Sequence, residues 1–144
     1  DLTMYQKGFS LIEIMVVIAI ISILSAIAIP GYQGYMQKAA MTDVLQTILP
    51  YKNNVELCSF NQGGLSQCNS GKDNIPINIT GKYIKQIDVK SGVITLNTEK
   101  ALTGLSITLS PIISTDNAPF KWSVICEIDN NDNLKSLCEK TLSF

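Results

Sequence analysis

The feature that most constrains this chain is an apolar run close to its N-terminus. From Phe9 to Ile29 there are 21 residues and a single charged side chain, Glu13. A helix of about 20 apolar residues is long enough to cross a hydrocarbon core of about 30 Å. A carboxylate in such a helix costs about 2.5–3.5 kcal/mol near the bilayer centre. Glu13 lies near one end, where this cost is smaller, but its presence still requires an explanation.

Three interpretations of this run compete. It could be a signal anchor, or a secretory signal peptide cut after the small residues of segment 25–28, although the apolar part of such a peptide is usually only about 7–15 residues long. The third interpretation rests on the motif Gly8-Phe9-Ser10-Leu11-Ile12-Glu13. This motif resembles the processing site of type IV pilins, in which a short leader ends in Gly before Phe-Thr-Leu-Ile-Glu. Ser10 stands where Thr is commoner, and the chain looks like a type IVa pilin.

The resemblance implies a division into three parts: a leader over residues 1–8, a transmembrane and filament-core helix over 9–30, and a globular head over 31–144. It also implies that a prepilin peptidase cleaves between Gly8 and Phe9 and methylates the new amino group of Phe9. A positive charge beside an apolar segment tends to stay in the cytoplasm. Lys7 is therefore expected to hold the start of the helix at the inner face, with the chain after Pro30 outside.

Glu13 acquires a role within this interpretation. Residues four apart lie on the same face of a helix, so Glu13 is close to the new amino terminus at Phe9. The resemblance implies that the carboxylate of Glu13 pairs with the amino group of a neighbouring subunit and selects the register during assembly. Such a pair neutralises two charges that are each costly in an apolar core. The alternative is a carboxylate that only reaches out to the lipid headgroups.

The helix is expected to continue beyond the apolar run. Pro30 and Pro50 lack the N–H that an internal helical residue donates, so each predicts a kink. Between Tyr32 and Phe60, apolar residues recur at helical spacing and predict a stripe that packs on the head. The members of this stripe are Met41, Val44, Leu45, Ile48, Val55 and Leu57.

The remainder of the chain predicts an antiparallel sheet after a loop. Turn-forming residues over Cys58–Lys82 indicate the loop. Short β-rich segments with no helical segments between them indicate antiparallel strands; they are Tyr83–Val89, Val93–Leu96, Leu105–Leu109 and Trp122–Ile128. The apolar face of this sheet needs a second layer, which the amphipathic helix supplies. The fold class is therefore α+β: a long, kinked N-terminal helix against four antiparallel strands, with a C-terminal loop that the resemblance implies is closed by a disulfide.

Four cysteines, all after residue 57, indicate two disulfides and an oxidising compartment. Four cysteines allow three pairings. We favour the pairing of sequence neighbours, Cys58–Cys68 and Cys126–Cys138. Pilins of this class close a C-terminal loop with such a bridge, which supports the second pair, and a subset of them carries an extra bridge near the end of the helix.

Composition argues against catalysis. The formal net charge is −1 and the chain has no histidine, the residue that most often serves as general base or metal ligand. The sequence contains no phosphate-binding loop and no CxxC pair. We therefore expect no enzyme activity, no cofactor and no metal. The oxygen-rich segment Asp129–Asn133 could hold calcium, but its spacing does not fit an EF-hand, and a solvated turn is the preferred interpretation.

The resemblance implies a subunit of a type IV pilus that polymerises through its N-terminal helix into a helical filament, a homopolymer of this chain. It implies a Gram-negative source, a single-pass inner-membrane precursor with a periplasmic head, and an extracellular fibre after assembly. The expected partners are the prepilin peptidase and the pilus assembly machinery. Fibres of this family serve adhesion, twitching motility and DNA uptake, so a host surface and DNA are candidate external partners.

Two alternatives stay open. A pseudopilin of a type II secretion system shares the N-terminal motif; calcium at Asp129–Asp132 would favour it, whereas Cys126 and Cys138 argue against it. A minor, DNA-binding pilin is the other alternative, with phosphate contacts from Lys82, Lys85 and Lys90. Asp88 lies among these lysines, and a solvated strand face is the simpler interpretation of them.

Overall fold

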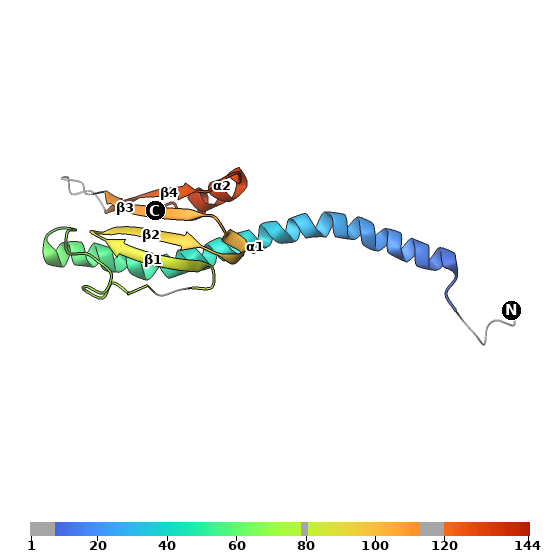
Figure 1. The fold of residues 1–144 in the computed structure, drawn as a ribbon. Helices are drawn as coiled ribbons and strands as arrows, with labels where there is room; N and C mark the ends of the chain where they lie inside the picture. Colours follow the sequence, from blue (N-terminus) through green and yellow to red (C-terminus); the bar gives the residue numbers. More distant parts are fainter. Residues whose placement is uncertain (1–7, 79–80, 113–119) are drawn as a thin grey trace. The chain divides into compact units, whose positions relative to one another are not determined.

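The computed structural model describes residues 8–78, 81–112 and 120–144, with only the backbone of Pro30 described. The predicted leader over residues 1–7 lies outside the described residues. The elements follow the order α1 (Leu11–Gln62), β1 (Ile84–Lys90), β2 (Val93–Thr98), η2 (Lys100–Leu102), β3 (Ser106–Ile112), β4 (Lys121–Glu127) and α2 (Asp132–Thr141), as Figure 1 shows. Residues up to Tyr35 form one compact unit and residues from Met36 form another.

The sheet of the head is a simple antiparallel meander. Its strands lie in the order β1-β2-β3-β4, each paired with its neighbour in sequence. The turn between β1 and β2 consists of Ser91 and Gly92, with φ of 51° and 81°. Two successive residues with positive φ match the twist of a two-residue hairpin. The four predicted strands are confirmed, although β2 and β3 run further than the sequence predicted, to Thr98 and Ile112.

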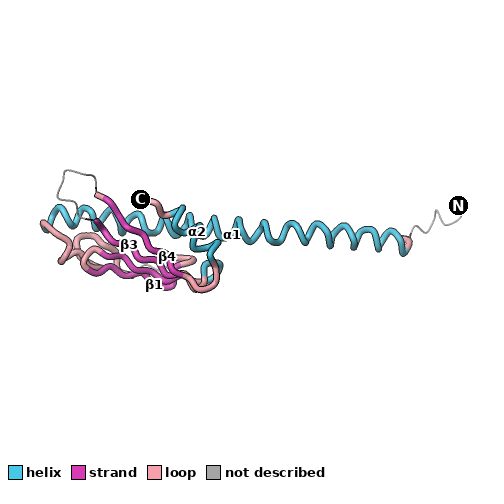
Figure 2. Tube along the Cα trace, turned by 90° about the horizontal axis from the view of Figure 1, so that it is seen from above, coloured by secondary structure: helices cyan, strands magenta, loops and turns pink. Residues whose placement is uncertain are grey.

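The head half of α1, residues 36–62, lies along one face of this sheet (Figure 2). The stripe that it buries consists of Ala40, Met41, Val44, Ile48, Tyr51, Val55 and Cys58. The facing strands contribute alternate residues, such as Ile94 and Leu96 of β2 and Ile107 and Leu109 of β3. The predicted stripe is thus confirmed in outline. Leu57 is the error, because it is 51% exposed and turns away from the sheet.

A polar contact adds to this apolar packing. The indole Nε1 of Trp122 in β4 donates to the carboxylate Oε1 of Glu56 in α1 at 3.1 Å. The same oxygen lies 3.3 Å from the Nζ of Lys52, one helical turn earlier. Trp122 is almost completely buried, so its N–H needs a partner of this kind. The contact joins β4 directly to the helix.

Both prolines stay within the helix. α1 is assigned from Leu11 to Gln62, across Pro30 and Pro50, and extends past the point where the sequence predicted a loop to begin. The predicted kinks at the two prolines stay predictions.

The segment after the sheet is closed by a disulfide, as expected, and it contains a helix that the sequence did not predict: residues Asp132–Thr141 form α2. Asn131 caps this helix: its side-chain Oδ1 accepts from the backbone N of Leu134 at 3.1 Å. Leu134 and Cys138, four residues apart, are buried on one face of the helix. The asparagines and aspartates that suggested a solvated turn therefore include a helix N-cap.

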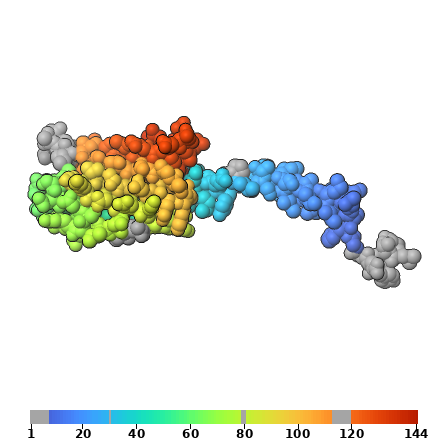
Figure 3. All heavy atoms as spheres, viewed as in Figure 1, coloured from blue at the N-terminus to red at the C-terminus, as the bar shows by residue number. Residues whose placement is uncertain are grey.

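The structure joins the cysteines as Cys58–Cys68 and Cys126–Cys138. The first bond connects the last turns of α1 to the loop that follows it, and the second connects β4 to α2. All four cysteines are fully or almost fully buried. Figure 3 shows that the segment after α1 (green) lies on the surface beside β1 and β2 (yellow-green and yellow).

Candidate processing and assembly site

The candidate site lies at the start of α1 and includes the residues just before it. Ser10 precedes the helix, and its hydroxyl Oγ accepts from the backbone N of Glu13 at 3.3 Å. Its carbonyl oxygen accepts from the backbone N of Ile14 at 3.2 Å. Ser10 is therefore the N-cap of α1. A serine at this position satisfies one of the four N–H groups that a helix leaves without a partner.

Sequence analysis missed this role of Ser10. The pattern that could have revealed it is Ser-x-x-Glu before an apolar run, which is the signature of a capping box. Ser10 and Glu13 have this spacing. Glu13 also lies in the first turn of the helix, where the helix dipole favours a negative charge. Glu13 thus has a local role besides the intermolecular one that the pilin motif implies.

Gly8 and Phe9 lie before the helix and are exposed. A Cβ built on Gly8 meets no atom within 4 Å. Packing against the described residues therefore does not require a glycine at this position.

Phe9 and Glu13 line the same shallow hollow of about 190 Å³, together with Ile14, Val17 and Ile18. Apart from the carboxylate, its lining side chains are apolar. Within residues 8–78, 81–112 and 120–144, Glu13 has no ion-pair partner. The site therefore presents one carboxylate, beside the residue predicted to carry the new amino terminus, in otherwise apolar surroundings.

From Leu11 to Ile29, α1 is apolar apart from Glu13 and two serines, and the described residues leave it uncovered. Its large apolar side chains in this range are exposed, from Ile14 at 46% to Leu11 at 74%. Its polar interruption at Ser22 is satisfied internally, because the hydroxyl donates to the carbonyl of Ile18 at 2.8 Å. Among the described residues, α1 is the one helix that is long and apolar enough to span a membrane, a criterion that a signal sequence near an N-terminus also meets.

The structure does not gather the lysines of the DNA-binding alternative into a site. Lys82 lies with its Nζ 5.4 Å from the ring centroid of Tyr83. Lys85 lies at the irregularity in the β1–β2 pairing, and Lys90 is five positions away at the far end of the strand. Asp88, between them, accepts from the hydroxyl of Ser70 at 3.2 Å.

Among the described residues, no three acidic, cysteine or histidine side chains lie close enough together to hold an ion, and this includes those of Asp129–Asn133. Asn131, at its centre, is occupied as the N-cap of α2.

A motif of this kind at the start of a long helix, followed by a head in which the same helix packs on a four-stranded antiparallel sheet, defines the pilin class of proteins. Similarity to known proteins supports the same class. Residues 3–29 match the family model described as the prokaryotic N-terminal methylation motif. The prepilin peptidase-dependent protein D of Escherichia coli K12 is 45% identical over 96% of this chain and 95% of its own length.

Two further similar proteins are both named as major type IV pilins. The type IV major pilin protein PilE1 of Neisseria gonorrhoeae is 41% identical over 62% of this chain and 56% of its own length. A solution NMR structure of the major type IV pilin PpdD from enterohaemorrhagic Escherichia coli superposes with a TM-score of 0.66. It is 37% identical and covers 76% of this chain and 83% of its own. The chain belongs to the type IV pilin family, which confirms the resemblance seen at Gly8–Glu13. Members of this family are structural proteins.

Proposed function

We propose that this chain is the structural subunit of a type IV pilus, cut between Gly8 and Phe9, methylated on Phe9 and polymerised through its N-terminal helix. The observation that carries the proposal is the exposed apolar helix with one carboxylate, Glu13, beside Phe9. A helix that is apolar all round is stable only when something covers it. Lipid would cover it in the inner-membrane precursor, and the helices of other copies would cover it in the fibre.

Glu13 is the proposed register-selecting group. Cleavage after Gly8 would create a positive amino group on Phe9, and both charges would be costly in the apolar centre of a fibre unless they pair. Pairing with the amino group of a neighbouring copy satisfies both and fixes the axial position of one subunit against the next. The outer surface of the head would then serve the fibre in adhesion, twitching motility or DNA uptake.

The first experiment is mass spectrometry of the N-terminal peptide from protein sheared off the cell surface. The proposal expects a peptide that begins at N-methylated Phe9. A peptide that begins at Ile29, or an intact leader found only in membranes, would overturn it.

A second experiment tests Glu13 itself. Replacing Glu13 by Ala removes the carboxylate, so Gly8–Phe9 cleavage should continue while the yield of sheared filaments falls steeply. Glu127→Ala is the matched control, because Glu127 is an exposed carboxylate of the head. If the Glu13→Ala variant gives the same filament yield as the control, the proposed role of Glu13 is wrong.

The pseudopilin alternative predicts a different response. The name of the Escherichia coli K12 relative says only that it depends on prepilin peptidase, whereas PilE1 and PpdD are named as major type IV pilins. The similarity to these two supports the pilus. A rise in the melting temperature of the head on addition of calcium would favour the pseudopilin, and an unchanged melting temperature would favour the pilus.

A further inference from the structure

The outer edge of β1 is covered in an unusual way. β1 is an edge strand of the sheet, and the unpaired N–H and C=O groups of an edge strand are a template for pairing with another chain. Here the outward amides are occupied by side chains. The backbone N of Ile87 donates to Asn78 Oδ1 at 3.0 Å, that of Val89 to Ser70 Oγ at 2.8 Å, and that of Ser91 to Asn69 Oδ1 at 2.8 Å.

These three acceptors belong to one segment, residues 68–78, which we call the strap. The strap makes two backbone bonds here: the N of Ser70 donates to the carbonyl of Val89 at 3.0 Å, and the N of Gly92, in the turn after β1, donates to the carbonyl of Cys68 at 2.8 Å. Otherwise its side chains stand in for the neighbouring strand that β1 lacks. Because amides two residues apart point to the same side of a strand, the strap satisfies the outward series of amides from Ile87 to Ser91.

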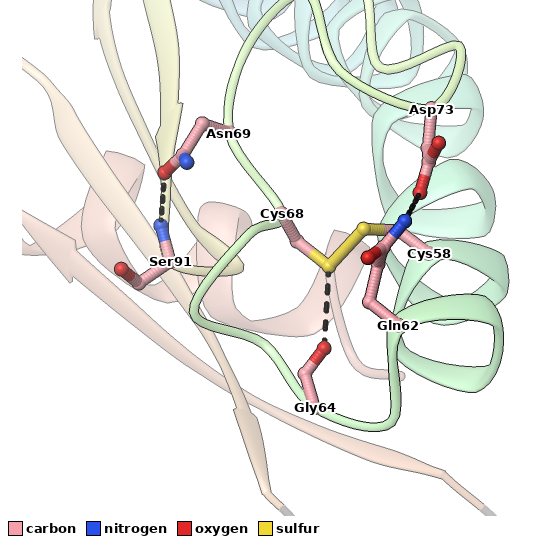
Figure 4. The surroundings of a disulfide bond; sticks show 7 residues. All are labelled: Cys58, Gln62, Gly64, Cys68, Asn69, Asp73 and Ser91. Carbon is pink, nitrogen blue, oxygen red and sulfur yellow. Dashed lines mark hydrogen bonds between the residues drawn. A yellow bond between two sulfur atoms is a disulfide. The ribbon is translucent and has the colours of Figure 1, made fainter.

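The disulfide anchors the strap directly beside the two residues that accept from the amides of Val89 and Ser91. Cys68 is bonded to Cys58 of α1, and the next two residues, Asn69 and Ser70, are the acceptors for Ser91 and Val89. Figure 4 shows this arrangement: Cys68 and Asn69 lie on one stretch of chain, Cys58 lies on α1, and Ser91 in the turn after β1 donates to Asn69. The middle of the strap is anchored by Ile75, which is buried.

The remaining anchors are weaker. Asn54 Nδ2 donates to the carbonyl of Asn74 at 3.0 Å, and Gln62 Nε2 donates to Asp73 Oδ2 at 2.9 Å, both at exposed positions. Exposed polar contacts of this kind exchange readily with water and contribute little to stability. Hydrogen bonds at Cys68 and Ser70 also hold the part of the strap that covers Val89 and Ser91, and the disulfide at Cys68 is its one covalent anchor among the described residues.

We propose that the strap is a removable cover for the β1 edge and that the Cys58–Cys68 disulfide locks it in place. Before this bond closes, the open edge pairs with β1 of a second copy of this chain. Closure removes two protons and two electrons from the two thiols and passes them to a disulfide-bearing oxidant, which leaves as a dithiol. The newly exported chain is thus protected from edge-to-edge pairing only once it is oxidised.

Charge complementarity identifies the second copy as the occupant. Two copies of β1 that pair antiparallel about Val89 bring each Val89 opposite its counterpart and Ile87 opposite Ser91. This register uses the three amides that the strap now occupies. It also places Asp88 of each copy opposite Lys90 of the other, and opposite charges in this position stabilise a pair of strands. Asp88 and Lys90 are both exposed.

The test measures amide hydrogen exchange in the full chain in detergent micelles. The variant Cys58→Ala/Cys68→Ala removes the lock. The matched control is Cys126→Ala/Cys138→Ala. The two cysteines of this bond are 12 residues apart in sequence, compared with 10 for Cys58–Cys68, so its removal should cost a similar amount of loop-closure stabilisation. Exchange at each amide is normalised to that of Leu109 in the interior strand β3, so that global destabilisation cancels.

At low protein concentration, the amides of Val89 and Ser91 in the unlocked variant should exchange about tenfold faster or more, relative to Leu109. The control variant should keep their protection. At high protein concentration their protection in the unlocked variant should return, because a second copy now pairs with the edge. The charge reversal Lys90→Glu in the unlocked variant should abolish this return, and the swap Asp88→Lys/Lys90→Glu should restore it.

Unchanged relative exchange at Val89 and Ser91 in the unlocked variant would overturn the lock. The same opening in the control variant would also overturn it, because the effect would then not be specific to Cys58–Cys68. Opening that is independent of protein concentration would overturn pairing with a second copy.

Discussion

The two halves of α1 form one continuous helix, but they differ in what covers their side chains. In residues 11–35 every side chain that the structure describes is exposed, apart from Ser25, which is half-buried. In residues 36–62 a stripe of seven residues from Ala40 to Cys58 is buried against the sheet. Helix propensity alone stabilises neither half to a large extent, because most helix stability comes from packing of an apolar face.

Because the two halves of α1 are covered differently, substitutions in them are expected to affect different properties: folding of the head in one half and association in the other. The head half obtains its packing from its own chain, so substitutions there change the free energy of unfolding of the head. The described residues of the chain leave the other half uncovered, so under the proposed function its packing comes from lipid or from other chains. Substitutions there are then expected to change association and to leave the stability of the head unchanged. Three predictions follow from this contrast, from the largest expected effect to the smallest.

The contrast is strongest between Ile48 and Ile18. Ile48 is completely buried and Ile18 is 57% exposed. Ile48→Ala should lower the free energy of unfolding of the head by about 2–5 kcal/mol, because it removes buried methyl groups and leaves a cavity. Ile18→Ala should leave the thermal unfolding of the head unchanged. Thermal unfolding of both variants in detergent checks this, and equal losses of stability would break the comparison.

A smaller, local effect is expected at Ser10. Loss of an N-cap hydroxyl costs about 0.5–2 kcal/mol of helix stability. Ser10→Ala should therefore increase amide exchange at Glu13 and Ile14, while Ser10→Thr, which retains a hydroxyl, should preserve protection. The melting temperature of the head should be the same in both variants. A change in that temperature would show that the first turn of α1 affects the head.

The smallest effect is expected at Leu57, on the outer face of the head half. Because its side chain is 51% exposed, Leu57→Gln should change the free energy of unfolding by less than about 0.5 kcal/mol. Chemical denaturation of the full chain in detergent measures this, with Val55→Ala, at a buried position two residues away, as the destabilised control. A loss comparable to that of the control would mean that Leu57 is covered in the native head.

Sequence periodicity was sufficient for the parts of the fold that repeat regularly. The unbroken apolar run, the motif at Gly8–Glu13 and the strict alternation in β3 each carry their signal locally. The exposure of Leu57 was missed because the helical spacing of apolar residues defines only an approximate face. At the boundary of a stripe, the tertiary packing decides which side chain is covered.

The parts that were missed depend on polar side chains acting on backbone groups. α2 is short and mostly polar, and the sequence signal for it is a cap at Asn131 with Leu134 and Cys138 four residues apart. The strap was harder still to foresee. Asn69, Ser70 and Asn78 lie in the loop that the sequence predicts. Their side-chain oxygens nevertheless accept from backbone amides that lie between 9 and 22 residues away in sequence. No local pattern encodes contacts at that range.

The turn at Ser91 and Gly92 also has a practical consequence for labelling. Hairpin tips usually tolerate inserted tags, but this one is enclosed. The N of Gly92 donates to the carbonyl of Cys68 at 2.8 Å, and a Cβ on Gly92 would lie only 2.7 Å from Cδ2 of Leu65. An epitope inserted here would displace the neighbouring loop. The exposed pair Asp129–Asn130, which precedes the cap of α2, offers the better position for a fluorophore or an affinity tag.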